Sequence, residues 1–324
     1  MDRPRGDNFP GGRPATAKDA AVATYFPVSG VETPLWLPPL VAFCISFFTS
    51  MGGVSGAFLL LPFQVSVLGY AAPSVSATNH LFNVVATPGG VYRYIRERRM
   101  VWPLAWATIL GTLPGVFLGA WIRIAYLPDP RHFKLFAGCV LVCIAARLGA
   151  DAIRKRPGPR AAGEGAGSGP APERVVTKAE LSLRRVAFVF QGRAHGASAA
   201  GVFALCFLVG IAGGIYGIGG GAIIAPFFVA VFGMPVHAVA GAALMGTLVT
   251  SAAGVAFYQA FAALRPETAA APDWLLGLLF GAGGLCGIYL GARCQKYFPA
   301  RIIKLILTGC VLFVGAKYLL GFFR

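Results

Sequence analysis

The stretch GGIYGIGGGAIIAPFF, residues 213–228, places six glycines within nine positions of a strongly apolar segment. Glycine tolerates a positive φ and lets another backbone approach closely, so this run predicts a break in an otherwise helical segment. A similar stretch, SMGGVSGAFLLLPFQ at residues 50–64, is also rich in glycine and also ends near a proline. Lipid cannot satisfy the backbone groups that a break frees, so we expect both breaks to face protein or a water-filled cavity.

The composition indicates that these segments lie in a lipid membrane. The 324 residues are 56% hydrophobic and 12% charged, which is typical of an integral membrane protein. Most of the apolar blocks are about as long as the roughly 20 residues that a spanning helix needs. We therefore expect an all-α membrane protein with about four spanning helices in each half. The eight blocks are 36–69, 74–95, 101–125, 132–153, 199–233, 236–262, 273–296 and 300–323.

The two halves resemble each other. Residues 51–94 match residues 215–258 at 12 of 44 positions when they are aligned at a fixed offset. The GxxxGxxxG pattern at 111–119 recurs at 283–291, so the duplication extends beyond the first two blocks. We interpret the chain as two homologous helical repeats, 36–153 and 199–324, each with a glycine-broken first helix. A flexible tail, 1–35, and a basic, disordered linker, 154–198, complete this division.

The distribution of basic residues predicts which side of the membrane the linker occupies. The linker holds nine of the 28 lysines and arginines, so we expect it to be cytoplasmic in a protein of the inner or plasma membrane. Four crossings in each half would place 19 basic residues inside and 7 outside. If each broken block were a hairpin, the repeats would be inverted and the numbers would be 17 and 9. Because the parts of a broken block are short for two full spans, we expect eight spans with an irregular first helix in each half.

Polar residues follow each break at helical spacing. Asn79 and Asn83 in the first half correspond to Ala243 and Thr247 in the second, and steps of four place such residues on one helix face. Asn and Thr side chains can donate hydrogen bonds to an oxyanion, although they could equally join helices to one another. The restarting end of a broken helix also suits an anion, because its N–H groups and its positive dipole end are free.

These patterns define the candidate residues. His80 is a candidate for gating, or it donates a hydrogen bond to a neighbouring carbonyl. Pro62 and Pro226 are further candidates for gating. The candidates for substrate binding are Gly53, Gly56, Asn79, Asn83, Gly217, Gly219, Gly220, Gly221, Thr247 and Ser251.

The chain resembles the TauE/SafE sulfite exporter family of membrane transporters. The resemblance extends over both halves and is carried by GIYGIGGGAIIAPFF at 214–228, its degenerate copy GGVSGAFLLLPF at 52–63, the polar helix after each, and the glycine-patterned helices at 111–120 and 283–292. It implies transport, most simply export, of sulfite, sulfonates or related small sulfur-containing anions. The partners implied are a small anionic substrate and the lipid bilayer.

Other functions are disfavoured by the residues that the spans contain. None of the twelve acidic residues lies inside an expected span, so we expect no carboxylate relay for protons. The spans contain no catalytic set of an intramembrane enzyme, and the cysteines lack metal-type spacing, so we expect no metal and no cofactor. The net charge of +16 has no separate domain that could bind nucleic acid. Transport of another small anion, such as thiosulfate or a short carboxylate, and a membrane scaffold or assembly factor remain the alternatives.

Overall fold

The computed structural model describes residues 23–52, 55–153, 176–182, 185–190, 193–294, 297 and 300–322. Six of the described helices are long and apolar enough to cross a membrane, namely α6, α7, α8, α10, α11 and α12. The helices of the first half are α2 (Leu37–Gly52), α3 (Ala57–Ser66), α4 (Ser74–Ala86), α5 (Pro88–Arg96), α6 (Trp102–Ala125) and α7 (Pro130–Ile153). Those of the second half are α8 (Ala199–Tyr216), α9 (Gly220–Val231), α10 (Val236–Leu264), η1 (Pro266–Thr268), α11 (Trp274–Cys294) and α12 (Ala300–Phe322).

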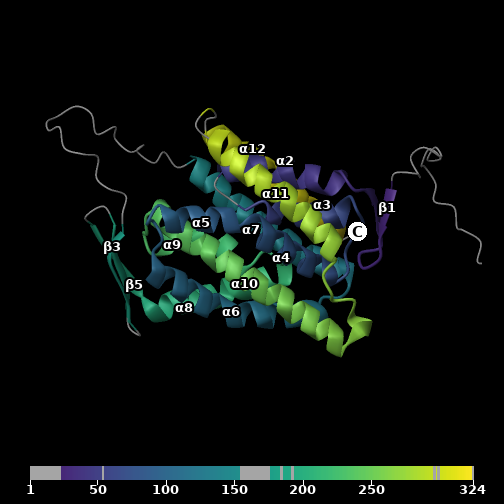
Figure 1. Ribbon diagram of the computed structural model, residues 1–324, viewed down its shortest axis with the longest axis horizontal. Helices are drawn as coiled ribbons and strands as arrows, with labels where there is room; N and C mark the ends of the chain where they lie inside the picture. The colour runs from purple at the N-terminus through teal and green to yellow at the C-terminus, as the bar shows by residue number, and fades with distance from the viewer. Residues whose placement is uncertain are drawn as a thin grey trace, which may run out of the picture.

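The helices of the two halves pack against each other reciprocally (Figure 1). The first helix of each half packs on the second-to-last helix of the other half. Helix α2 packs on α11, and α8 packs on α6. The last helices, α7 and α12, form a pair, and α4 contacts α10. Each half therefore packs its first helix mainly against the other half.

Glycines make two of these contacts possible. A Cβ atom added at Gly115 or Gly119 of α6 would overlap backbone carbonyl groups of α8. One added at Gly287 or Gly291 of α11 would overlap backbone carbonyl groups of α2. The GxxxG patterns therefore serve close helix crossing, as is common in membranes.

The order of these contacts gives the direction of each helix. Gly111 faces Cys206 while Gly119 faces Ile211 and Ile215, so α6 and α8 run in the same direction. The contacts of α2 with α11, and of α11 with α4, also advance together along both helices. Between α4 and α10 the order is reversed, because His80 meets Tyr258 whereas Gly90, just beyond α4, meets Leu244. Helices α2, α4 and α11 therefore oppose α6, α8 and α10.

Each glycine-broken block is a helical hairpin. The start of α9 lies against the later part of α8, where Gly220 approaches Gly210, and its end lies near the start of α8, where Phe232 approaches Gly201. In the first half, α3 returns toward the start of α2, because Gly56 approaches Ser46 whereas Phe63 meets Phe280 of α11, and the nearby Gly283 lies against Pro39. The expectation of one irregular span in each block was therefore wrong. Short helices that fold back need not cross the whole bilayer, so their length did not argue against a hairpin.

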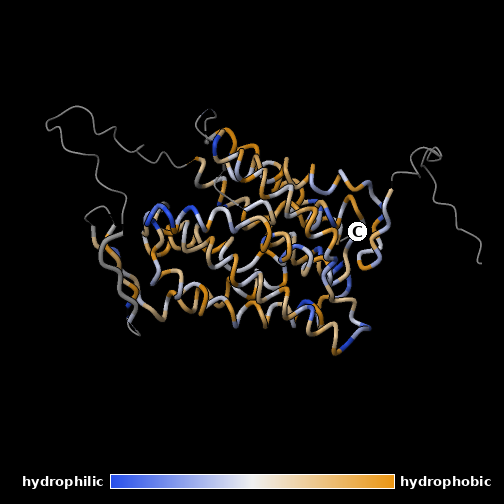
Figure 2. Tube along the Cα trace, in the orientation of Figure 1, coloured by the Kyte–Doolittle hydropathy of each residue, from blue (hydrophilic) through white to orange (hydrophobic). Residues whose placement is uncertain are grey.

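The two small β-sheets lie at opposite ends of the helix bundle. The β-hairpin of β1 (Ala23–Phe26) and β2 (Val31–Pro34) lies at the same end as the C-terminus of α12, here called the termini end (Figure 1). The sheet of β3 (Val176–Leu181), β4 (Arg185–Phe190) and β5 (Arg193–Ser198) lies at the opposite, linker end. Hydrophilic residues concentrate toward these two ends, with a mainly hydrophobic region between them (Figure 2).

Parts of the segments expected to lack structure are ordered strands. Phe26 and Val31 of the expected tail 1–35 are buried in the main hydrophobic core. Within the expected linker 154–198, Val186 and Phe188 of β4 are buried against residues of α6 and α8. Buried and less buried residues alternate along β4, as in a strand packed on one face, and the Gly- and Pro-rich composition of 154–174 concealed this short pattern. Residues 1–22 and 154–175 lie outside the described part of the chain.

Candidate functional site

The second helical hairpin turns at three residues. Helix α8 ends at Tyr216, and Gly217 follows in the left-handed conformation, with φ of 79°. The N–H groups of Gly217 and Ile218 both donate to the carbonyl of Gly213, which closes the C-terminus of α8. Gly219, with φ of 68°, then precedes the first residue of α9. Positive φ at two of three positions explains the glycines there.

The N-terminus of α9 lies tightly between α6 and α10. A Cβ atom on Gly219 would lie 2.7 Å from Ser251 Oγ and 3.1 Å from Thr250 Oγ1. One on Gly220 would lie 2.6 Å from the side chain of Thr112, and one on Gly221 would overlap the backbone of α10 at Thr247. The structure thus brings Gly219, Gly220 and Gly221 together with Thr247 and Ser251. Gly217 lies apart from this group, against the backbone of Ser76 in α4.

The hydroxyl groups around this N-terminus differ in their hydrogen bonds. Thr247 donates to Ala243 O at 2.9 Å, and Thr250 donates to Gly246 O at 2.6 Å, so both protons are used within α10. Ser251 Oγ is fully buried and has no hydrogen-bond partner. Ser251 is therefore the hydroxyl of this group that is free to donate, and Thr247 is free only to accept.

The two asparagines of α4 also differ. Asn79 Nδ2 donates to Ala57 O at 3.1 Å, and Asn79 Oδ1 accepts from Gln64 Nε2 at 3.5 Å, so this side chain joins α4 to α3. Asn83 is fully buried, and neither Nδ2 nor Oδ1 has a partner. Because α4 and α10 are antiparallel and His80 faces Gly254, Asn83 lies at the level of Ser251. A buried amide and a buried hydroxyl without partners therefore occupy one level of the central helix pair.

His80 lies one turn away from Asn83. Its ring is fully buried against Gly254, with its centroid 6.1 Å from that of Tyr258, and it faces the carbonyl of Gly214. The hydroxyl of Tyr258 donates to the same carbonyl at 3.1 Å. His80 therefore borders the end of α8, but neither of its ring nitrogens has a hydrogen-bond partner.

The first hairpin is linked to the second through a proline. Pro62 has no N–H, so the carbonyl of Phe58, four residues earlier in α3, lacks its helical donor. Tyr216 Oη donates to this carbonyl at 2.8 Å. In the same region Gly56 precedes α3, and a Cβ atom there would lie 2.7 Å from Ser46 Oγ. Gly53 and the side chain of Pro226 lie outside the described residues, although Pro226 falls within α9.

Several polar residues of this region were not among the candidates from the sequence. Ser76 donates to Ile215 O at 2.8 Å and helps to hold the end of α8. Gln64 and Arg123 are fully buried as well. Their signal in the sequence was the presence of a long polar side chain in an apolar block, which is costly in lipid. Within the described residues, no three His, Cys, Asp or Glu side chains are grouped so as to hold a metal ion.

Comparison with protein families identified a match over most of the chain. The model described as "Sulfite exporter TauE/SafE" matches residues 39–318, which include every described helix except α2's first two residues and α12's last four. No curated protein and no solved structure matched the chain.

Proposed function

Since this chain belongs to the sulfite exporter TauE/SafE family, a family of membrane transporters and not of enzymes, we propose that it exports sulfite, sulfonates or related small sulfur-containing oxyanions. Membership in the family and the six long apolar helices make it a multi-pass membrane transporter for small anions. The substrate within this class and the direction of transport are the proposal.

The observation that carries the proposal is the pair of unpartnered polar side chains at one level of α4 and α10, of which Ser251 lies beside the start of α9. Buried polar groups in proteins nearly always have hydrogen-bond partners, so Asn83 and Ser251 call for a ligand or water between helices. Ser251 lies against Gly219, where the N-terminus of α9 supplies free N–H groups and a positive dipole end. An oxyanion would accept hydrogen bonds from all three.

The chemistry of this site favours weak binding. The residues placed there, Gly219–Gly221, Asn83, Thr247 and Ser251, are neutral donors and acceptors without a fixed charge. They can replace the water around an oxyanion without holding it so strongly that release becomes slow. We expect dissociation constants in the micromolar to millimolar range, about −8 to −4 kcal/mol, and a preference for oxyanions over chloride.

The arrangement of the halves supports an inverted repeat. The proposed equivalent helices α2 and α8, α4 and α10, and α6 and α11 run in opposite directions, and each first helix packs on the other half. Many transporters place the substrate between such repeats, near the middle of the membrane. We propose the same location here, with the linker end of the molecule in the cytoplasm of a cell whose inner or plasma membrane holds the protein.

The charged residues of the spanning helices bear on how transport is driven. Among the described residues of the long helices, no carboxylate lies near the middle of a span, which disfavours a proton relay of Asp or Glu. Transport is then passive, driven by the membrane potential, or coupled to a proton that the substrate itself carries.

A substrate panel in vesicles tests the function. Purified protein reconstituted in vesicles should move sulfite or sulfonates faster than chloride, thiosulfate or short carboxylates, under an imposed potential or pH gradient. A preference for thiosulfate or carboxylates would identify a transporter of another anion. The absence of flux for every anion, with protein correctly inserted, would favour the scaffold or assembly role instead.

A further inference from the structure

Arg123 is a charged residue buried near the termini end of α6. Its side chain is fully buried, and an arginine keeps its charge under all ordinary conditions. It lies in the last turn of a helix long and apolar enough to span a membrane. A charge in such a position is costly unless it is paired, and intramembrane charges are usually functional.

The guanidinium is held on three sides. One terminal nitrogen donates to Ala71 O at 2.8 Å and the other donates to Leu127 O. The guanidinium carbon lies 3.8 Å from the ring centroid of Phe133. These contacts fix the orientation of the group but bring no negative charge to it.

The guanidinium also keeps free donor capacity. Nε of Arg123 is buried and has no hydrogen-bond partner. Over the described part of the chain, no carboxylate forms an ion pair with Arg123, and the carboxylate of Asp273 accepts from Ser29 and Leu276 instead. A buried positive charge with an unused donor fits a small oxyanion.

Tyr258 connects this charge with the central site. Along α10, Ser251, Gly254 and Tyr258 follow one another at helical spacing on the face toward α4. Ser251 borders the start of α9, Gly254 faces His80, and Tyr258 packs with Ala120 of α6 in one buried cluster. Arg123 follows Ala120 by three residues on α6. Polar groups thus extend from the central site to Arg123 toward the termini end.

We propose that Arg123 forms a second anion-binding site, at which the transported oxyanion stops between the central site and the termini end. This inference rests on the proposed function. The anion supplies the counter-charge that the buried guanidinium lacks and accepts a hydrogen bond from Nε. Because the guanidinium already shares its charge with two carbonyls and an aromatic ring, the anion is held reversibly.

The first experiment compares flux in vesicles for four proteins: wild type, Arg123→Gln, Arg123→Lys and Arg265→Gln. Arg265 is exposed at the same end and controls for a change of surface charge. Arg123→Gln should raise the half-saturating sulfite concentration about ten- to a hundredfold, as expected for a lost hydrogen bond to a charged group. Arg123→Lys should lie in between, and Arg265→Gln should resemble wild type.

The second experiment uses the unmodified protein, so it does not depend on the folding of variants. Phenylglyoxal, a reagent for arginine, is added to vesicles during transport, and modified residues are mapped by mass spectrometry. Arg123 should be modified, and a sulfonate, which unlike sulfite does not add to the aldehyde group of phenylglyoxal, should slow its modification in a concentration-dependent manner, whereas equal chloride should not.

Two results would overturn the inference while leaving transport intact. One is a wild-type half-saturating concentration in a folded Arg123→Gln protein. The other is an Arg123 that phenylglyoxal never reaches in wild-type protein that transports sulfite. If wild-type protein moves no anion at all, the proposed function fails first, which the same flux measurement reveals.

Discussion

At the scale of single residues, side chains that look equivalent in the sequence differ in their hydrogen bonds. Asn79 and Asn83 are both fully buried on α4, one turn apart. Asn79 is satisfied by Ala57 and Gln64, whereas Asn83 has no partner. The same residue type therefore joins two helices at one position and has no hydrogen-bond partner at the next.

This difference predicts opposite effects of two alanine substitutions. Asn83→Ala should weaken binding of the transported anion about ten- to a hundredfold, because a hydrogen bond to a charged group is worth about 1.5–3 kcal/mol. Its thermal stability should change little. Asn79→Ala should instead lower the melting temperature and leave affinity nearly unchanged. Flux and melting curves of both variants, at matched expression, check this. If Asn83→Ala keeps the wild-type affinity, the anion does not contact Asn83.

Two glycines with positive φ allow a test of the space around the start of α9. Gly219 and Gly233 both have positive φ, but only Gly219 has atoms close to a new Cβ, namely Ser251 Oγ at 2.7 Å. Alanine strains the backbone at either position, so the Gly233 variant controls for the loss of a glycine with positive φ. We predict that Gly219→Ala loses most of its flux while inserting normally, and that Gly233→Ala keeps most of it. Comparable flux in both variants would place the pathway elsewhere.

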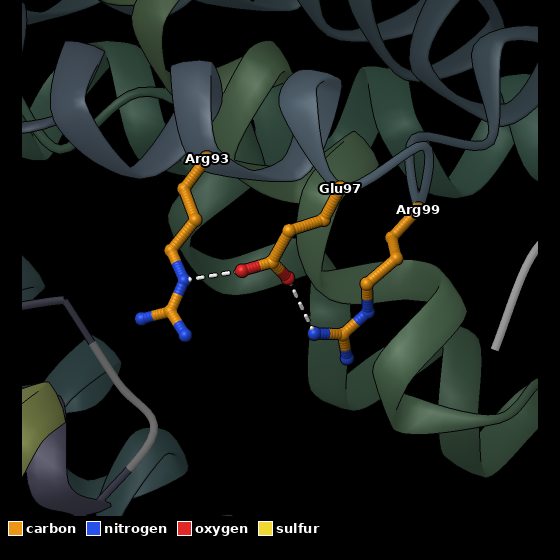
Figure 3. A network of polar contacts seen from close by, with 3 residues as sticks. All are labelled: Arg93, Glu97 and Arg99. Carbon is orange, nitrogen blue, oxygen red and sulfur yellow. Dashed lines mark hydrogen bonds and ion pairs between the residues drawn. The ribbon is translucent and has the colours of Figure 1, made fainter. Parts of the chain in front are cut away.

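At the scale of elements, the linker end contains a small ion-pair network (Figure 3). Glu97 follows α5 and accepts from Arg93 Nε at 2.7 Å and from Arg99 at 2.9 Å. The hydrogen bond from Arg93 and then that from Arg99 lower the pKa of Glu97. The carboxylate would otherwise be unfavourable at the C-terminal end of a helix.

The sign of this shift predicts a dependence on pH. A carboxylate with a lowered pKa in the folded state stabilises the protein fully above its unfolded pKa, and the contribution is lost as pH falls through the folded pKa. The melting temperature of wild type should therefore slightly exceed that of Glu97→Gln at pH 7, and the difference should vanish in acid. Both groups are partly exposed, so the difference is small. A difference that grows as the pH falls would contradict this assignment.

The elements also mark the limit of prediction from the sequence. Gly217 and Gly219 were found because a helix cannot continue through them, and Gly115 and Gly119 because their spacing is that of close crossing. The fold-back of α3 and α9 was not predicted, because helix length does not determine the direction in which a chain leaves a break. The hydrogen-bond partners of Asn79, and the lack of partners for Asn83, depend on how α3, α4 and α10 pack together, so no local sequence pattern predicts them.

At the scale of the whole molecule, the fold-backs place the linker and the termini at opposite ends. The loop after α10, which contains Glu267, lies at the termini end, where Ala269 O accepts from Ser74 N at the start of α4. In the arrangement with four crossings in each half, this loop would have shared the side of the linker. The position of Glu267 relative to the linker therefore distinguishes the two arrangements.

Labelling of introduced cysteines checks this prediction. In a variant without the seven native cysteines, Glu267→Cys should react with a membrane-impermeant thiol reagent in intact cells, and Arg156→Cys should react only after the cells are opened. Transport by the variants controls for correct folding. Reaction of Arg156→Cys in intact cells would reverse the orientation, and protection of both cysteines would restore the arrangement with four crossings in each half.

The reciprocal packing of α2 on α11 and of α8 on α6 has a consequence for synthesis at the ribosome. When the first half has entered the membrane, the surface of α2 that receives Gly283, Gly287 and Gly291 has no partner until α11 emerges. The β1–β2 hairpin also lacks a contact at this stage, because Ser29 donates a hydrogen bond to Asp273, 244 residues later in the chain. Each half therefore needs the other half to complete its packing. Two chains separated within residues 154–175 should assemble when made together in one cell, whereas either chain made alone should be degraded.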